Sequence, residues 1–293
     1  TSGIAIQDCV AVGNAAFKGS SSTTTGANGT IAIGRNALNG LSTGNGNVAI
    51  GYYSMAGGGT QNTSTAVGYA TLQNSTSGMV GNTAIGYGVL DAANNSGADD
   101  NTGVGKEALG QLSSGAQNVA VGKDAGNVIQ AGNNNVCIGK GANPNAHGGA
   151  NQIVLGKDAT GVADNSVTLG NSDVTDVYMA EDAGAKVRCS AIVHTQENVT
   201  ISSGVITVTS SYVRVLTEGS ASSDDLDTIN GGVAGQVLYL HQQFSTKDVT
   251  LKDGTGNLAL AGDFAMSHAL DMIHLIYSEA DSVWIEVSRS NNN

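Results

Sequence analysis

The chain of 293 residues has a net charge of −12, contains 42 glycines but one proline, and is charged at only 12% of its positions, about half the share of an average globular domain. This acidic balance argues against nucleic acid as a partner, because phosphate binding needs a basic surface. No apolar run approaches the about 18 residues of a membrane-spanning helix, and three widely spaced cysteines are too few for a disulfide framework or a zinc site.

Composition differs between two parts of the chain. Residues 1–186 hold 34 of the glycines, whereas residues 171–293 hold 16 of the 24 acidic side chains. We therefore predict a repetitive unit, an acidic linker and a β-rich unit. In chain order these are residues 1–175, residues 176–190 and residues 191–293.

The first unit is built from one short repeat. A tetrapeptide of apolar, small, apolar residue and glycine occurs ten times, and the steps between its glycines run from 14 to 21 residues, most often 17. These motif glycines are Gly13, Gly34, Gly51, Gly68, Gly86, Gly105, Gly122, Gly139, Gly156 and Gly170. Repetition at so constant a period indicates a solenoid.

Each tetrapeptide predicts a β-strand followed by a sharp corner. Alternating branched and small side chains, as in Val48–Ile50, have the period of two of a strand, and the glycine permits positive φ. One coil cannot bury its own strand, whereas stacked coils pair their strands in parallel and pack each column of Ile and Val on its neighbours. We predict an all-β chain, with a parallel β-roll of about ten coils followed by a small β-sandwich-like tip unit.

An asparagine recurs four positions before the motif glycine. It is found at Asn47, Asn82, Asn101, Asn118 and Asn135. We expect a structural role, either as a stacked ladder of amides or as a partner of loop backbone. Ordinary turn chemistry is the alternative.

The position directly after the motif glycine is a candidate binding surface. It holds Tyr52, Tyr69 and Tyr87 in three successive coils and lysine in the next four. Stacked tyrosine rings would hold the face of a sugar. The alternative is a solvated wall, in which each lysine forms an ion pair that contributes little to stability.

The second unit contains short strand patterns separated by turn signals. The expected strands are Val199–Ser202, Val205–Thr209, Tyr212–Thr217, Gln236–His241, Asp248–Lys252, Asn257–Leu260, Met272–Tyr277 and Ser282–Ser288. Their spacing is typical of a sandwich or a small barrel.

Two loops of this unit are expected to form the contact face of the tip. The first, Ser220–Asp227, includes Asp224, Asp225 and Asp227, which we expect in an exposed loop or at a helix N-terminus. The second, Gln242–Asp248, includes Gln242 and Gln243.

Sites for catalysis, metals and cofactors are not expected. The three aspartates lack the spacing of a calcium loop, and no histidine pair has the spacing of metal ligands. Motifs of phosphate-binding loops, serine hydrolases and zinc proteases are missing from the sequence. We therefore predict neither an enzyme nor a cofactor-binding protein.

The repeat resembles that of a known family. The segments NVAIGYYS at Asn47–Ser54 and NVAVGKDA at Asn118–Ala125 are similar to the head repeats of YadA-like trimeric autotransporter adhesins and to repeats of bacteriophage tail fibres. The resemblance covers residues 4–175, although most coils here are longer than is common in that family. It implies a parallel β-roll that associates as a homotrimer. Residues 235–290 are similar in pattern to C-terminal segments of phage fibre proteins.

The function implied by this resemblance is attachment. We expect a tail-fibre protein of a phage virion that binds a host cell-surface receptor, either a glycan or an outer-membrane component, and other tail proteins, without inserting into a membrane. Three alternatives stay open. They are an architectural decoration fibre, a fragment of a bacterial trimeric surface adhesin, and a polysaccharide-degrading enzyme, which would need a pair of carboxylates.

Overall fold

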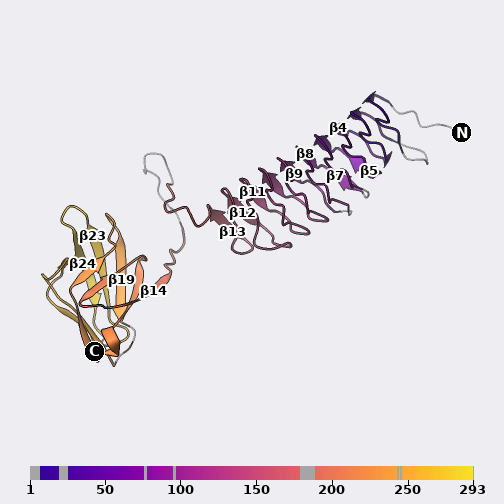
Figure 1. Cartoon of the computed structure of the whole chain (residues 1–293). Coiled ribbons are helices and arrows are strands. Elements are labelled where there is room, and N and C mark those ends of the chain that lie inside the picture. Colours follow the sequence, from indigo (N-terminus) through magenta and orange to yellow (C-terminus); the bar gives the residue numbers. More distant parts are fainter. Residues whose placement is uncertain are drawn as a thin grey trace. The chain divides into compact units, whose positions relative to one another are not determined.

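The computed structural model describes residues 7–19, 26–75, 78–94, 97–178, 189–242, 244 and 246–292. The chain divides into two compact units, Thr1–Ala185 and Lys186–Asn293, each visible in Figure 1. Residues 179–188, within the expected linker, lie outside the described ranges. No helix in the described part of the chain is long and apolar enough to cross a membrane.

The first unit is a parallel β-solenoid. Among the described residues, ten strands form one sheet in the order β1 (Val10–Val12), β2 (Ile31–Ile33), β4 (Val48–Ile50), β6 (Thr65–Val67), β8 (Thr83–Ile85), β9 (Thr102–Val104), β10 (Val119–Val121), β11 (Val136–Ile138), β12 (Gln152–Leu155) and β13 (Ser166–Leu169). All neighbouring strands are parallel. Each strand is the apolar part of one tetrapeptide, so the predicted β-roll is confirmed.

A smaller parallel sheet joins three of the loops between these strands. It contains β3 (Leu41–Thr43), β5 (Gly59–Asn62) and β7 (Met79–Val80). Within this sheet, the side-chain hydroxyls of the paired residues Thr43 and Thr60 lie 2.7 Å apart. The long loops of the first coils therefore stack in the same way as the tetrapeptides.

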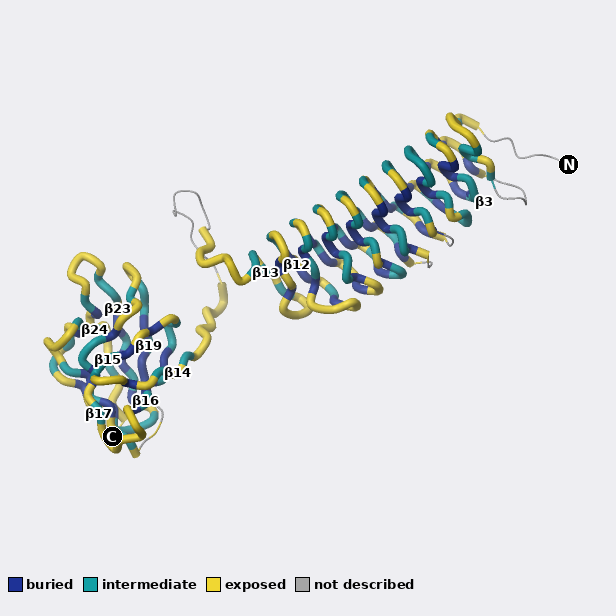
Figure 2. The backbone as a smooth tube through the Cα atoms, viewed as in Figure 1, coloured by how far each residue is buried: buried dark blue, intermediate teal, exposed yellow. Residues whose placement is uncertain are grey.

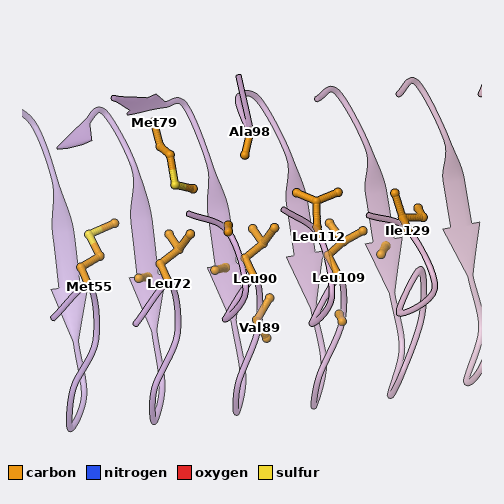
Figure 3. Close-up of a cluster of buried hydrophobic side chains, with 14 of the residues drawn as sticks. Met55, Leu72, Met79, Val89, Leu90, Ala98, Leu109, Leu112 and Ile129 are labelled. Atoms are coloured by element: carbon orange, nitrogen blue, oxygen red, sulfur yellow. The ribbon is translucent and has the colours of Figure 1, made fainter. Parts of the chain in front are cut away.

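The small residue in the middle of each strand faces the interior. Ala32, Ala49, Ala66, Ala84 and Ala120 are fully buried. A second column, four residues after the motif glycine, fills the remaining space with larger side chains, and Figure 3 shows its members Met55, Leu72, Leu90 and Leu109 along the roll. Buried positions recur at the same place in successive coils in Figure 2. The core is thus narrow.

The branched side chains of the strands point to the other side of the sheet, away from this core. Their exposed members retain between 36% and 60% of their accessible surface. We call this surface the outer apolar face, and its exposed members are Val10, Val12, Ile33, Ile85, Val121, Ile138, Ile153, Val167 and Leu169. The columns of Ile and Val therefore stack along the roll, but the alanines line its interior.

Each coil turns at several positive-φ positions. The motif glycine Gly68 has a φ of +135°, and a Cβ on it would lie 1.7 Å from the carbonyl oxygen of Gly86 in the next coil. The second and fourth residues after the motif glycine are also left-handed, for example Glu107 and Leu109, with φ of 57° and 53°. The sequence indicates the first corner in every coil, because it is always a glycine. The other two are marked only in some coils, by residues that tolerate positive φ, such as Gly88 and Gly141 at the second position and Gly126 at the fourth.

The recurring asparagines form a buried ladder. The Asn118 Nδ2 donates to Asn101 Oδ1 and to the Gly132 carbonyl oxygen, at 3.0 and 2.9 Å. The Asn118 Oδ1 accepts from the backbone N–H and the Nδ2 of Asn135, both at 3.0 Å. The expected structural role is therefore confirmed, and both expected modes, amide stacking and pairing with loop backbone, are present in the same side chain.

The described part of the second unit is all β apart from one 3₁₀ turn, Glu218–Ser220. A six-stranded sheet has the order β14 (Gln196–Thr200), β16 (Tyr212–Leu216), β19 (Val237–Gln242), β23 (Met272–Ser278), β24 (Val283–Ser290) and β21 (Leu258–Ala259). A three-stranded sheet contains β17 (Ser223–Leu226), β20 (Asp248–Leu251) and β22 (Phe264–Met266), and a pair contains β15 (Val205–Thr207) and β18 (Thr228–Asn230).

One hydrophobic core joins the sheets of this unit. Leu238 and Ile273 of the six-stranded sheet belong to the same buried cluster as Leu251 and Met266 of the three-stranded sheet. Trp284 is fully buried in it and donates its Nε1–H to the Ile229 carbonyl oxygen at 2.9 Å. Each of the eight expected strands overlaps a strand of the structure, and β17, β18 and β22 were not foreseen.

The expectation of a loop or a helix N-terminus at Asp224 and Asp225 is wrong, because both lie in strand β17. This strand pairs in parallel with β20 and has Leu226 buried at its end. It is the edge strand of its sheet, where charged side chains reach water and discourage further pairing. Asp227 directly follows the strand.

Candidate functional site

The three tyrosines after the motif glycines form a stacked column, which we call the tyrosine ladder (Tyr52, Tyr69 and Tyr87). The ring centroids of Tyr52 and Tyr69 are 5.4 Å apart with an angle of 13° between planes, and those of Tyr69 and Tyr87 are 5.1 Å apart at 5°. The register of the coils imposes this stacking, because each ring leaves the same position of successive turns. The expected stack is thus present.

A cationic side chain lies over the tyrosine ring at each end of the tyrosine ladder. The Arg35 guanidinium lies 5.6 Å from the ring centroid of Tyr52, and the Lys106 ammonium lies 5.5 Å from that of Tyr87. Tyr69 and Tyr87 keep about half of their surface, 48% and 50%. Burial, then the hydrogen bond and charge of Tyr53, raises the pKa of Tyr52. This phenol therefore stays neutral at physiological pH.

At the same position of the later coils, the lysines form solvated ion pairs with neighbouring carboxylates. Lys106 pairs with Glu107 at 3.3 Å, Lys123 with Asp124 at 3.3 Å and Lys157 with Asp158 at 3.5 Å. All three pairs are well exposed. Exposed pairs of this kind contribute little to stability, which agrees with the alternative weighed for this column.

A hollow of about 370 Å³ opens beside Tyr87. Its lining consists of Tyr87, Gly88, Asp91, Glu107, Gly110, Gln111 and Asn127. Sequence reasoning selected Tyr87 from this set and missed the others. The signal that would have found three of them is the column five residues after the motif glycine, which reads Gln73, Asp91, Gly110 and Asn127 in successive coils.

The aspartates of the second unit make contacts within their own unit. Asp224 accepts the backbone N–H of Glu218 at 2.6 Å, and Asp227 accepts the hydroxyl of Thr255 at 3.1 Å. Asp225 is exposed on β17. No group of three His, Cys, Asp or Glu side chains in the described ranges is arranged to hold a metal ion. The structure thus places Asp224 and Asp225 on one edge strand and Asp227 directly after it, and gives Asp224 and Asp227 structural partners.

Gln242 is buried, with 1% of its surface exposed. It ends strand β19 and lines a cavity of about 10 Å³ with Phe244 and Lys247. Its amide is therefore unavailable at the surface of this unit. Gln243, the neighbouring candidate, lies outside the described residues.

Sequence reasoning also missed an aromatic and cationic row on the six-stranded sheet. Tyr212 stacks on His241 with centroids 5.1 Å apart, and Tyr239 stacks on His274 at 4.7 Å. Burial and the neighbouring Arg214 charge lower the pKa of His241, so its imidazole is neutral at physiological pH. The alternation of Tyr239 and His241 along β19 was the available signal.

No protein-family model matches the sequence, and neither a curated protein nor a solved structure matches it. What the site can do therefore follows from its geometry. The tyrosine ladder offers half-exposed aromatic side chains on a repetitive scaffold, and the hollow next to Tyr87 offers carboxylates and amides. Such a combination suits binding of a polar ligand that has one apolar face.

Proposed function

We propose that this chain is a structural fibre protein of a phage virion and attaches the particle to the surface of its host cell. The observation that carries the proposal is the repeat, since coils such as NVAIGYYS at Asn47–Ser54 resemble those of tail fibres and YadA-like adhesins and fold into a β-roll. The activity is binding, not catalysis. Other tail proteins are its partners in the virion, and the receptor is a glycan or an outer-membrane component.

The proposed assembly is a parallel homotrimer, supported by the outer apolar face. Val121, Ile138 and Ile153 lie on neighbouring strands of one sheet and stay partly exposed. Extended apolar surfaces are rare on monomeric proteins and mark contacts with partners. Because the face repeats with every coil, copies of the chain that lie side by side in register bury it along the whole solenoid.

Sedimentation equilibrium of the full chain tests the homotrimer. We expect the mass of three chains for the wild type and a shift toward monomer for the double variant Val121→Glu/Ile138→Glu, which places two carboxylates on the outer apolar face. Gln117→Glu/Gln130→Glu is the matched control, because it adds the same charge at exposed loop positions, one shortly before β10 and one between β10 and β11. A monomeric wild type would contradict the assembly.

Attachment is tested by binding the fluorescent full chain to a panel of bacterial strains. We expect saturable binding to some strains and weaker binding of the Val121→Glu/Ile138→Glu variant, since loss of the trimer removes the gain from several linked contacts. Competition with phage particles for the same cells separates a virion fibre from a bacterial adhesin. Trimers that bind no strain would overturn attachment and favour an architectural fibre.

A further inference from the structure

The hollow beside Tyr87 exists because two columns of the solenoid are interrupted by glycine. In the column five residues after the motif glycine, Gly110 stands between Asp91 and Asn127. A Cβ on Gly110 would lie 2.9 Å from Asn127 Oδ1, so this amide reaches toward the gap. In the column two residues after the motif glycine, Gly88 precedes Glu107 and again lacks a side chain. The two gaps meet in one hollow.

The walls of the hollow are polar. Asp91 accepts a hydrogen bond from Asn74 Nδ2 at 3.1 Å, and burial raises the pKa of its carboxyl. The carboxylate of Glu107 lies 3.3 Å from the ammonium of Lys106. Gln111 is exposed at the rim. Carboxylates accept two or more hydrogen bonds, and amides both donate and accept, so this lining suits a ligand rich in hydroxyls.

Tyr87 supplies the apolar side of the hollow. Its ring is half exposed, and Tyr69 stacked 5.1 Å behind it fixes its plane. The Lys106 ammonium lies 5.5 Å from the ring centroid, so the exposed part of Tyr87 that borders the hollow is its edge with the hydroxyl. The C–H groups of a pyranose ring pack against this aromatic edge, while its hydroxyls reach the polar partners. The volume of about 370 Å³ lies within the range of small-ligand sites, about 300–1,000 Å³.

We propose that the hollow formed by Tyr87, Asp91, Glu107, Gln111 and Asn127 binds a neutral saccharide unit. Two carboxylates line it and the nearby cation is Lys106, so a sugar acid meets a net negative wall and is disfavoured. The identification of this saccharide as part of a host-surface glycan rests on the proposed attachment function. The hollow itself is defined by this chain's own residues.

Binding of free sugars to the full chain tests the site. The probes are methyl glycosides of glucose, galactose, mannose, rhamnose, N-acetylglucosamine and N-acetylgalactosamine, with N-acetylneuraminic acid as the acidic probe, in saturation-transfer NMR and calorimetry. We expect at least one neutral glycoside to bind in the millimolar range, below about 10 mM, and the acidic probe to bind more weakly. No neutral binder, or tighter binding of the acid, would overturn the proposal.

Matched variants locate the binding. Tyr87→Ala is expected to weaken it at least about tenfold, and Tyr52→Ala, at the far end of the tyrosine ladder, by less than about twofold. Gln111→Ala is a second test at an exposed position where folding is not at risk, and we expect a loss of about threefold or more. Equal losses in Tyr52→Ala and Tyr87→Ala would overturn the assignment to the hollow.

Cell attachment of the same variants separates this inference from the proposed function. Cells that bind the wild type and Tyr87→Ala equally well would overturn the role of the hollow and leave attachment standing. Saccharide binding that depends on Tyr87, in a chain that binds no cell, would keep the hollow and contradict attachment. Parallel loss of both activities in Tyr87→Ala supports both.

Discussion

Gly68 approaches the next coil more closely than any side chain permits. With a φ of +135° and a virtual Cβ 1.7 Å from the Gly86 carbonyl oxygen, Gly68→Ala must move the backbone of two coils. We expect a loss of at least about 3 kcal/mol in the free energy of unfolding. Denaturant unfolding followed by far-UV circular dichroism measures it.

Gly78→Ala provides the control for this loss. Gly78 has no atom within 4 Å of its virtual Cβ and no positive φ, so its replacement should change stability by no more than about 0.5 kcal/mol. Similar small effects of Gly68→Ala and Gly78→Ala would mean that the coils are not as closely stacked as the geometry requires.

Asp271 makes the stability of the second unit depend on pH. Although burial favours the neutral acid, the backbone N–H groups of Asn292, His268 and Ser267 together hold the pKa of Asp271 below its usual range. Their distances to the carboxylate are 2.6, 2.9 and 3.0 Å. A lowered folded-state pKa means that this stabilisation is present above the unfolded value, about 3.9, and is lost as the pH falls through the folded one.

Asp271→Asn should therefore destabilise the second unit by about 1.5–3 kcal/mol at pH 7, because an amide cannot accept all three backbone hydrogen bonds. The fluorescence of Trp284, the one tryptophan of the chain, reports this unit. We expect the difference between wild type and variant to shrink below about pH 4. A difference that stays constant from pH 7 to about pH 3 would refute the role of the carboxylate charge.

At the scale of the element, the buried asparagine ladder links one coil to the next. Asn118→Ala removes four hydrogen bonds, to Asn101, Gly132 and Asn135, from a fully buried site. We expect a loss of about 2–4 kcal/mol. Asn133→Ala, at an exposed position with a backbone hydrogen bond from Ala116 at 2.8 Å, should cost about 1 kcal/mol or less. Thermal unfolding of both variants compares them, and equal costs would contradict a structural ladder.

The strands of the solenoid could be predicted because each carries the same short alternating pattern. Alternation alone does not say which face is inside, and a large Ile usually suggests the interior more strongly than Ala does. Here the narrow cross-section admits Ala49 in the strand and Met55 after the corner, so Ile50 is left outside. Leu109 keeps positive φ because its burial outweighs the local strain.

Other features depend on pairing between distant segments. Asp224 and Asp225 have the composition of a loop, and only the non-local pairing with β20 makes them part of a strand. The tyrosine ladder followed directly from one column of the repeat, whereas the hollow depends on which columns lack a side chain. In the sequence, Gly110 cannot be told apart from an ordinary loop glycine. The gap that it leaves becomes apparent only when the side chains of the neighbouring coils are placed around it.

At the scale of the whole molecule, a coil should be removable as a unit. Deletion of residues 119–135 takes out 17 residues and joins Asn118 to Val136, which restores the Asn-Val-x-Ile-Gly pattern. We expect the shortened chain to fold with unchanged circular dichroism per residue, because the strand of the deleted coil pairs with both neighbours in the same parallel register. Deletion of residues 119–127, which breaks the register, is the control and should disrupt folding. Equal disruption by both deletions would contradict the equivalence of the coils.

The uniform pairing of the coils also bears on how the length of such a chain varies between generations. Each coil adds one strand spacing, about 4.8 Å, to the length of the solenoid and pairs its strand with its neighbours in the same parallel register. Tandem duplication or unequal recombination between gene segments that encode equivalent coils would therefore lengthen or shorten the solenoid in fixed steps. The length of the solenoid can then change by the gain or loss of whole coils, without a new arrangement of side chains in the core.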